Sequence, residues 1–84
     1  MKRKQRIQKK LNENFNEFEI NVNDHSSLHK GHNNFDGNGE THFFILLRKI
    51  KNIKINRLSI HRKINNLLKE EFSGGLHSIE IKII

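Results

Sequence analysis

The sequence contains no cysteine, no proline, no tryptophan and no tyrosine among its 84 residues. Without cysteine, the chain cannot form a disulfide framework, a CxxC redox site, a cysteine nucleophile or a thiolate metal site of its own. The six phenylalanines lie mostly at core-phase positions, which leaves few aromatic side chains to stack on single-stranded bases. No apolar run approaches the roughly 18–20 residues that a membrane-spanning helix needs. A length of 84 residues allows only one domain, so we expect one small domain over residues 1–84.

The glycine and serine patterns of several enzyme and binding classes are also absent. The five glycines form neither a Walker nor a Rossmann pattern, and no two of them have the spacing of the GxxG loop that clamps RNA in KH domains. No serine has the flanking glycines of a hydrolase nucleophile elbow. These absences favour a protein that is not an enzyme.

Positive charge is concentrated at the start of the chain. Six of the sixteen lysines and arginines lie in the first ten residues, and the rest of the chain carries ten basic and nine acidic residues. Such a patch can attract phosphate backbones or anionic lipid, or it can be the solvated face of a first helix. A transit peptide would share this composition, although the segment is short and contains no serine.

Hydrophobic spacing in the first half of the chain predicts one helix and two strands. An apolar residue at every fourth position predicts a helix at about 3–15, and alternation then predicts a half-buried strand at 18–22. A second and more deeply buried strand is expected at 42–47, antiparallel to the first. Residues 49–56 alternate but are rich in lysine and asparagine, so their structure stays open.

The second half of the chain predicts one more helix and one more strand. Apolar residues at spacings of three and four follow Asn56, which is the expected N-cap, and Gly74 and Gly75 end this helix, one of them in a left-handed conformation. A last strand is expected at 76–84. The economical arrangement of this α/β (α+β) chain packs both helices on one face of a three-stranded sheet.

A polar stretch at about 23–41 separates the first two predicted strands and carries half of the six histidines. A loop of this length in a small domain is usually functional or disordered. Neutral imidazole is the commonest metal ligand in proteins. His25, His29 and His32 are therefore either solvent-exposed loop residues or the ligands of a small zinc site.

His77 is the histidine with the most specific position. It follows the glycine pair and opens the last predicted strand, in phase with its isoleucines. It is either a partly buried core histidine or a metal ligand at the mouth of the strand, facing the histidine-bearing loop. Two imidazoles are too few for a closed site, so a partner would supply the remaining ligands. His42 and His61 are expected to bond to the backbone or to pack.

In their order and spacing, these motifs resemble the BolA-like family over nearly the whole chain. The likeness starts at Ile7, Lys10-Leu11 and Phe15 and continues with Asp24-His25-Ser26, His29-Lys30-Gly31-His32, Gly39-Glu40-Thr41-His42-Phe43, His61-Arg62 and Leu76-His77-Ser78. The last three segments are similar to the family's ETHF, Arg-His-Arg and VHA motifs. The chain departs from the pattern at His25, where the family has Glu, and at Ile60, where it has the first Arg.

The resemblance implies a class II KH-like fold of order α-β-β-α-β and a partnership with a monothiol glutaredoxin. In such heterodimers a [2Fe–2S] cluster is shared, for iron–sulfur cluster trafficking or iron sensing. Carried over by position, His77 and the loop residue His29 would hold one iron, with His32 as the alternative loop ligand. The glutaredoxin cysteine and a bound glutathione thiolate would hold the other iron.

The alternative function is that of a nucleic-acid-binding transcriptional regulator, because some BolA-like proteins are linked to transcription. Arg57, His61, Arg62 and Lys63 on the second predicted helix would enter a groove, and the basic N-terminus would add phosphate contacts. The missing GxxG loop and the isoleucine at position 60 count against sequence-specific recognition.

For the isolated chain we expect a monomer without a tightly bound cofactor and without membrane contact. A cytoplasmic location fits a cysteine-free chain with no secretion signal. A mitochondrial location would require a longer precursor that has been trimmed.

Mixed cysteine and histidine ligation predicts an acid-labile cluster. A histidine binds metal only as the neutral imidazole, so we expect the shared cluster to be lost as the pH falls toward about 6. Visible circular dichroism of the reconstituted heterodimer across this range measures the loss, with the cluster of glutaredoxin alone as the control. A spectrum of the shared cluster that is unchanged at about pH 5.5 would contradict the prediction.

Overall fold

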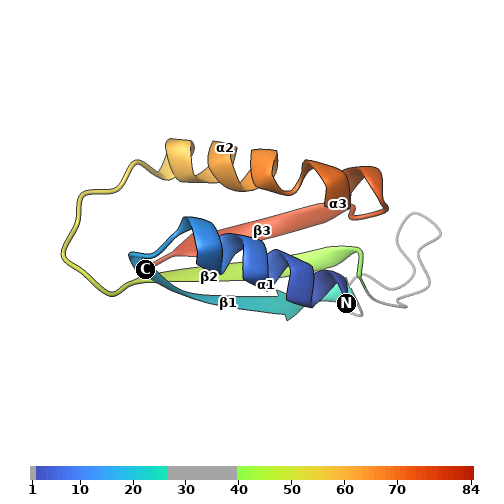
Figure 1. Cartoon of the computed structure of the whole chain (residues 1–84), viewed down its shortest axis with the longest axis horizontal. Coiled ribbons are helices and arrows are strands. Elements are labelled where there is room, and N and C mark those ends of the chain that lie inside the picture. Colours follow the sequence, from blue (N-terminus) through green and yellow to red (C-terminus); the bar gives the residue numbers. More distant parts are fainter. Residues whose placement is uncertain (1, 27–39) are drawn as a thin grey trace.

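The computed structural model describes residues 2–26 and 40–84, and these fold as a three-stranded sheet with helices (Figure 1). The elements in chain order are α1 (Arg3–Asn14), β1 (Phe18–Asp24), β2 (His42–Lys49), α2 (Arg57–Leu67), α3 (Lys69–Ser73) and β3 (Ser78–Ile83). The predicted order and fold class are confirmed, with α3 as a short additional helix. None of the helices described is long and apolar enough to cross a membrane.

The first helix has the boundaries that its apolar spacing predicts. Ile7 and Leu11 are fully buried on one face of α1, and Phe15 follows as the C-cap. The Phe15 amide still donates to the carbonyl of Leu11, while its ring meets Phe18 edge-on with 6.2 Å between centroids. These two buried rings therefore anchor the turn from α1 into β1 to the core, while Asn16 and Glu17 between them are exposed.

The sheet has the order β1-β2-β3, with β1 antiparallel and β3 parallel to the central strand β2. β1 extends to Asp24, two residues beyond the alternating pattern, and so takes up the start of the predicted 23–41 loop. Burial alternates along each strand. The buried residues of all three strands and of the helices join in one hydrophobic core, so the helices cover one face of the sheet, as expected.

The second predicted helix is divided in the structure. Asn56 caps α2 as expected, since its side-chain oxygen accepts the amide of Ser59 at 3.0 Å. The chain leaves helical geometry at the fully buried Leu68 and resumes as α3, which ends at the glycine pair. Gly75 has φ +117°, a conformation that L side chains rarely adopt, and this bears out the predicted left-handed glycine.

Candidate metal-ligand site

Three histidines lie at one end of the sheet, where β1 ends and where β2 and β3 begin. Asp24 pairs with Phe43, and His42 pairs with Ser78, so these strand ends lie side by side. We call this region the histidine end and define it by His25, His42 and His77. Residues 27–39 connect to the described chain here, because they follow Ser26 and precede Glu40.

His77 is exposed, and its backbone is hydrogen-bonded to the start of β2. It lies immediately before β3 rather than within it. The amides of His77 and Ser78 both donate to the carbonyl of Thr41, at 2.8 and 3.1 Å. The prediction of a partly buried core histidine is wrong, because position 77 lies at the end of the sheet and outside the buried row of β3. Its ring is presented to solvent from a hydrogen-bonded backbone.

The ring of His42 is the neighbour of the His77 ring. The two centroids are 5.5 Å apart, and the ring planes are nearly perpendicular at 76°. One ring nitrogen of His42, Nδ1, lies 2.9 Å from Oγ1 of Thr41. His42 is half-buried and its ring is oriented by this contact, so the ring packs in a fixed position beside the exposed His77.

His25 packs on the open face of the sheet. Its ring stacks on Phe44, with the centroids 5.4 Å apart and the planes inclined by 12°, and its amide donates to the carbonyl of His42. The other two histidines of the predicted zinc cluster, His29 and His32, lie outside the described residues. Among residues 2–26 and 40–84, no three His, Asp or Glu side chains are grouped closely enough to hold a metal ion.

A buried serine joins the two ends of the 27–39 connection. The Ser26 side-chain oxygen accepts the amides of Thr41 and His42, at 3.0 and 3.1 Å, and the residue is only 1% exposed. The Asp24 carboxylate accepts the amides of Ser26 and Glu40, at 2.9 and 3.0 Å. Partial burial of Asp24 acts to raise its pKa, but the hydrogen bonds from Ser26 and Glu40 outweigh it and hold the pKa below its usual value.

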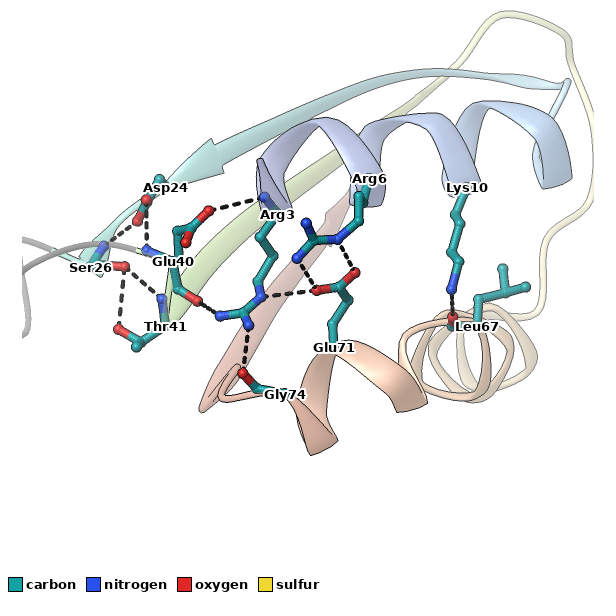
Figure 2. Close-up of polar contacts among 10 residues, drawn as sticks. All are labelled: Arg3, Arg6, Lys10, Asp24, Ser26, Glu40, Thr41, Leu67, Glu71 and Gly74. Carbon is teal, nitrogen blue, oxygen red and sulfur yellow. Dashed lines mark hydrogen bonds and ion pairs between the residues drawn. The ribbon is translucent and has the colours of Figure 1, made fainter. Parts of the chain in front are cut away.

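The guanidinium of Arg3 connects α1 to both segments that lead into the histidine end (Figure 2). Its Nε donates to Glu71 at 2.9 Å, and its two other nitrogens donate to the carbonyls of Glu40 and, at 2.8 Å, Gly74. The amide of Arg3 donates to the Glu40 carboxylate at 3.0 Å. Glu40 precedes Thr41, and Gly74 precedes the turn into β3, so Arg3 positions both sides of the site.

Glu71 is buried between two arginines. Arg6 donates to both of its carboxylate oxygens, at 2.7 and 2.9 Å, in addition to the bond from Arg3. The hydrogen bond from Arg6 is the main cause that lowers the Glu71 pKa to about 2, burial opposes it, and the bond from Arg3 adds to it. The carboxylate therefore stays ionised in the fold far below its ordinary pKa of 4.5.

Half of the basic N-terminal residues take part in structure rather than in an open patch. Arg3 and Arg6 pair with Glu71, and Lys10 donates to the carbonyl of Leu67 at 3.2 Å. The other three are exposed, Lys4 and Lys9 on α1 and Lys2 at its N-cap. The expected solvated helix face accounts for these three lysines alone.

The four α2 residues of the nucleic-acid hypothesis do not share one direction. Arg57, Arg62 and Lys63 are exposed, and His61 is half-buried. Lys63 turns toward α1, where its Nζ donates to the carbonyl of Asn14 and lies 4.8 Å from the centroid of the Phe15 ring. His61 and Arg62 instead line a shallow hollow on the other side of α2. Lys63 is thus separated from the surface that carries Arg62.

Fold and site together describe an α+β domain that presents an exposed histidine at one end of its sheet. The family model described as BolA-like protein matches residues 11–84. The chain belongs to the BolA-like family, as the sequence motifs predicted.

Known relatives and structures agree with this assignment. The chain is 38% identical over 77 residues to a Sinorhizobium protein described as "Uncharacterized protein in cobS 5'region", covering 90% of this chain and 83% of that one. It is 34% identical to the UV-induced protein uvi31 of Schizosaccharomyces pombe, covering 96% and 82% of the two chains. The BolA domain of SufE1 from Arabidopsis thaliana superposes with a TM-score of 0.79 at 32% identity, covering 99% of this chain and 91% of that one. BolA1 from the same plant gives 0.76 at 30% identity, covering 99% and 90%.

Several residues that build the site were not identified from the sequence. Arg3 and Arg6 were counted as part of a charged patch, and Glu71 lies in a run of charged residues that predicts only an exposed helix end. Ser26 and Thr41 appeared only as members of family-like segments. A buried ion pair between positions 68 residues apart has no local sequence signal.

We predict that Ser26→Ala loosens the histidine end. The substitution removes the acceptor of two backbone amides, and leaving such groups unsatisfied costs about 2 kcal/mol of unfolding free energy. Urea denaturation measures this loss, and hydrogen exchange should show reduced protection of the Thr41 and His42 amides. The control is Ser59→Ala, which removes an exposed hydroxyl on α2 and should change stability by less than about 0.5 kcal/mol. Equal stability of the two variants would contradict the role given to Ser26.

We also predict that Glu71→Ala costs about 3 kcal/mol, because it leaves the buried Arg3 without its carboxylate partner. Glu70→Ala, which changes the exposed neighbour, should cost less than about 0.5 kcal/mol. The depressed pKa of Glu71 fixes the pH window: its contribution is complete above the ordinary pKa of 4.5 and is lost as the pH falls toward about 2.

Urea midpoints of the wild type and Glu71→Ala should therefore converge across that acid range. A difference in stability that is constant from neutral pH to the acid limit would contradict the ion-pair account.

Proposed function

We propose that this BolA-like chain is the partner of a monothiol glutaredoxin, with which it shares a [2Fe–2S] cluster in iron–sulfur cluster trafficking or iron sensing. The observation that carries the proposal is His77, an exposed imidazole on a hydrogen-bonded backbone at the end of the sheet. Membership of the BolA-like family supports it. In this function the chain supplies histidine ligands to the shared cluster and is not an enzyme.

The geometry of His77 suits a ligand to a group that is shared with another protein. A shared ligand must reach the partner's surface, which a buried core histidine cannot do. It must also keep its position, and the bonds from His77 and Ser78 to Thr41 hold the backbone at that point. The neighbouring His42 ring, 5.5 Å away, restricts the space into which the His77 ring can turn.

The second histidine of the proposed ligand pair comes from the 27–39 connection. His29 is the first choice and His32 the alternative, and the two described ends of this connection, Ser26 and Glu40, lie at the histidine end. The two imidazoles would hold one iron, and the glutaredoxin cysteine with a glutathione thiolate would hold the other. Such mixed ligation raises the reduction potential relative to four thiolates.

A nucleic-acid-binding regulator remains the second proposal, on the strength of exposed Arg57 and Arg62 on α2. Its supporting surface is smaller than the sequence suggested, because Lys63 turns toward α1 and Arg3, Arg6 and Lys10 are held within the fold. It requires an affinity for DNA that falls steeply with salt and is lost in Arg62→Ala.

We predict that His77→Ala abolishes cluster sharing without affecting the fold. The chain is mixed with a monothiol glutaredoxin, glutathione, iron and sulfide under anaerobic conditions, and visible circular dichroism is compared with that of glutaredoxin alone. The wild type should give a new spectrum that His77→Ala lacks. His29→Ala and His32→Ala decide which residue is the loop ligand. Because His77 is exposed, its replacement should change the unfolding free energy by less than about 0.5 kcal/mol.

His61→Ala is the matched control, since it removes a histidine on α2, away from the histidine end, and should keep the shared spectrum. If the mixture shows only the glutaredoxin spectrum in the wild type as well, the cluster proposal fails, and salt-dependent DNA binding becomes the function to test.

A further inference from the structure

The two edges of the sheet differ in how they are closed. On the β1 edge, the Gln8 side chain donates to the carbonyl of Ile20 at 2.8 Å and accepts the amide of Val22 at 3.2 Å. The side-chain amide of Gln8 thus takes the place of a neighbouring strand, because it satisfies an outward-facing carbonyl and an outward-facing N–H group of β1. The helix α1 therefore blocks one edge of the sheet against further strand pairing.

The β3 edge has no such closure among the described residues. The backbone amides of Ser78 and Ile84 donate toward the central strand, to the carbonyls of Thr41, just before β2, and of Leu47 within it. Because backbone direction alternates along a strand, the amides and carbonyls of Ile79, Ile81 and Ile83 point away from β2. In the part of the chain that the structure describes, no side chain or strand bonds to these outward groups.

β3 has neither a proline nor a bulge, two of the features by which proteins protect an edge strand. Natural edges carry prolines, bulges or charges that repel a second strand. This strand has no proline, and its pairing with β2 runs from Ser78 to Ile83 without a bulge. Its two charges, Glu80 and Lys82, have opposite signs, so they do not repel a second copy of the strand.

The sequence of β3 is complementary to itself in one antiparallel register. With a two-fold axis at Ile81, each Ile79 lies opposite Ile83 of the second copy, and all the outward amides and carbonyls face one another. Glu80 of each copy then lies opposite Lys82 of the other, at the closely spaced positions where cross-strand side chains meet. A slide of two residues either way would place Glu80 against Glu80 or Lys82 against Lys82, and like charges in that position are destabilising.

We propose that the chain forms a symmetric dimer by antiparallel pairing of β3 with β3 of a second copy, which extends the sheet to six strands. One strand pair is a small interface, so the dimer is reversible and depends on concentration. The proposal departs from the expectation of a monomer. It is independent of the cluster proposal, because His77 precedes the paired residues and the two copies of His77 lie on opposite sides of the two-fold axis.

The first experiment follows the dimer by sedimentation over a range of chain concentrations. In Glu80→Lys and in Lys82→Glu, like charges face one another at both cross-strand positions that hold opposite charges in the wild type. Each variant should therefore weaken dimerisation by about tenfold. The double variant Glu80→Lys/Lys82→Glu restores opposite charges in the same register and should return to within a few-fold of the wild type. Both side chains are exposed, and unchanged far-ultraviolet circular dichroism verifies that each variant is folded.

The second experiment tests the register by disulfide trapping, which the cysteine-free chain allows without background. A mixture of Glu80→Cys and Lys82→Cys should form a cross-linked heterodimer on mild oxidation. Either variant alone should not, because its two copies lie on the diagonal, about 7–8 Å apart, beyond disulfide reach.

Three outcomes would overturn the proposal: a wild type that stays monomeric at every concentration, charge variants that dimerise like the wild type, or cross-linking of Glu80→Cys with itself. If the wild type is monomeric but the charge variants lose glutaredoxin binding, the β3 edge pairs with the partner protein instead.

Discussion

The buried ion pair of Arg3 and Glu71 is the contact on which the geometry of the site depends. Taking a guanidinium out of water is costly unless its donors are satisfied, and this one is satisfied by three residues from two segments of the chain. Glu71 holds it to α3, the Glu40 carbonyl to the start of β2, and the Gly74 carbonyl to the turn before β3. One side chain near the start of the chain thus fixes the relative positions of segments far apart in sequence.

Thr41 transmits this arrangement to the histidine end. Its amide donates to the buried Ser26 side chain, and its carbonyl accepts the amides of both His77 and Ser78. The backbone of His77 is therefore held by the start of β2, while its ring stays exposed. A rigid backbone with an exposed imidazole favours binding to a group held by another protein, because little order has to be created when the ligand is engaged.

The sequence predicted the elements well where apolar periodicity is strong. It predicted α1, the Asn56 cap and the alternating strands, because these follow from local spacing and capping. It missed the break at Leu68, because the apolar spacing continues across this position into α3 and gives no sign of a change in backbone geometry. The sequence also offered a partly buried His77, which the structure shows to be exposed. Alternation in phase with the isoleucines does not reveal where along the strand the helices begin to cover the sheet. Arg3 could not be told from its basic neighbours, because its partner is 68 residues away.

The same helix that closes one edge of the sheet leaves the other edge open. α1 carries both Gln8, which satisfies the backbone of β1, and Arg3, which holds the segments before β2 and β3. It makes no comparable contact with the outward backbone of β3 among the residues described. The two proposals therefore assign two uses to β3: a ligand, His77, before its first residue and a pairing edge along its length. Because these uses involve different residues and different chemistry, a charge reversal at position 80 acts on pairing and leaves His77 in place.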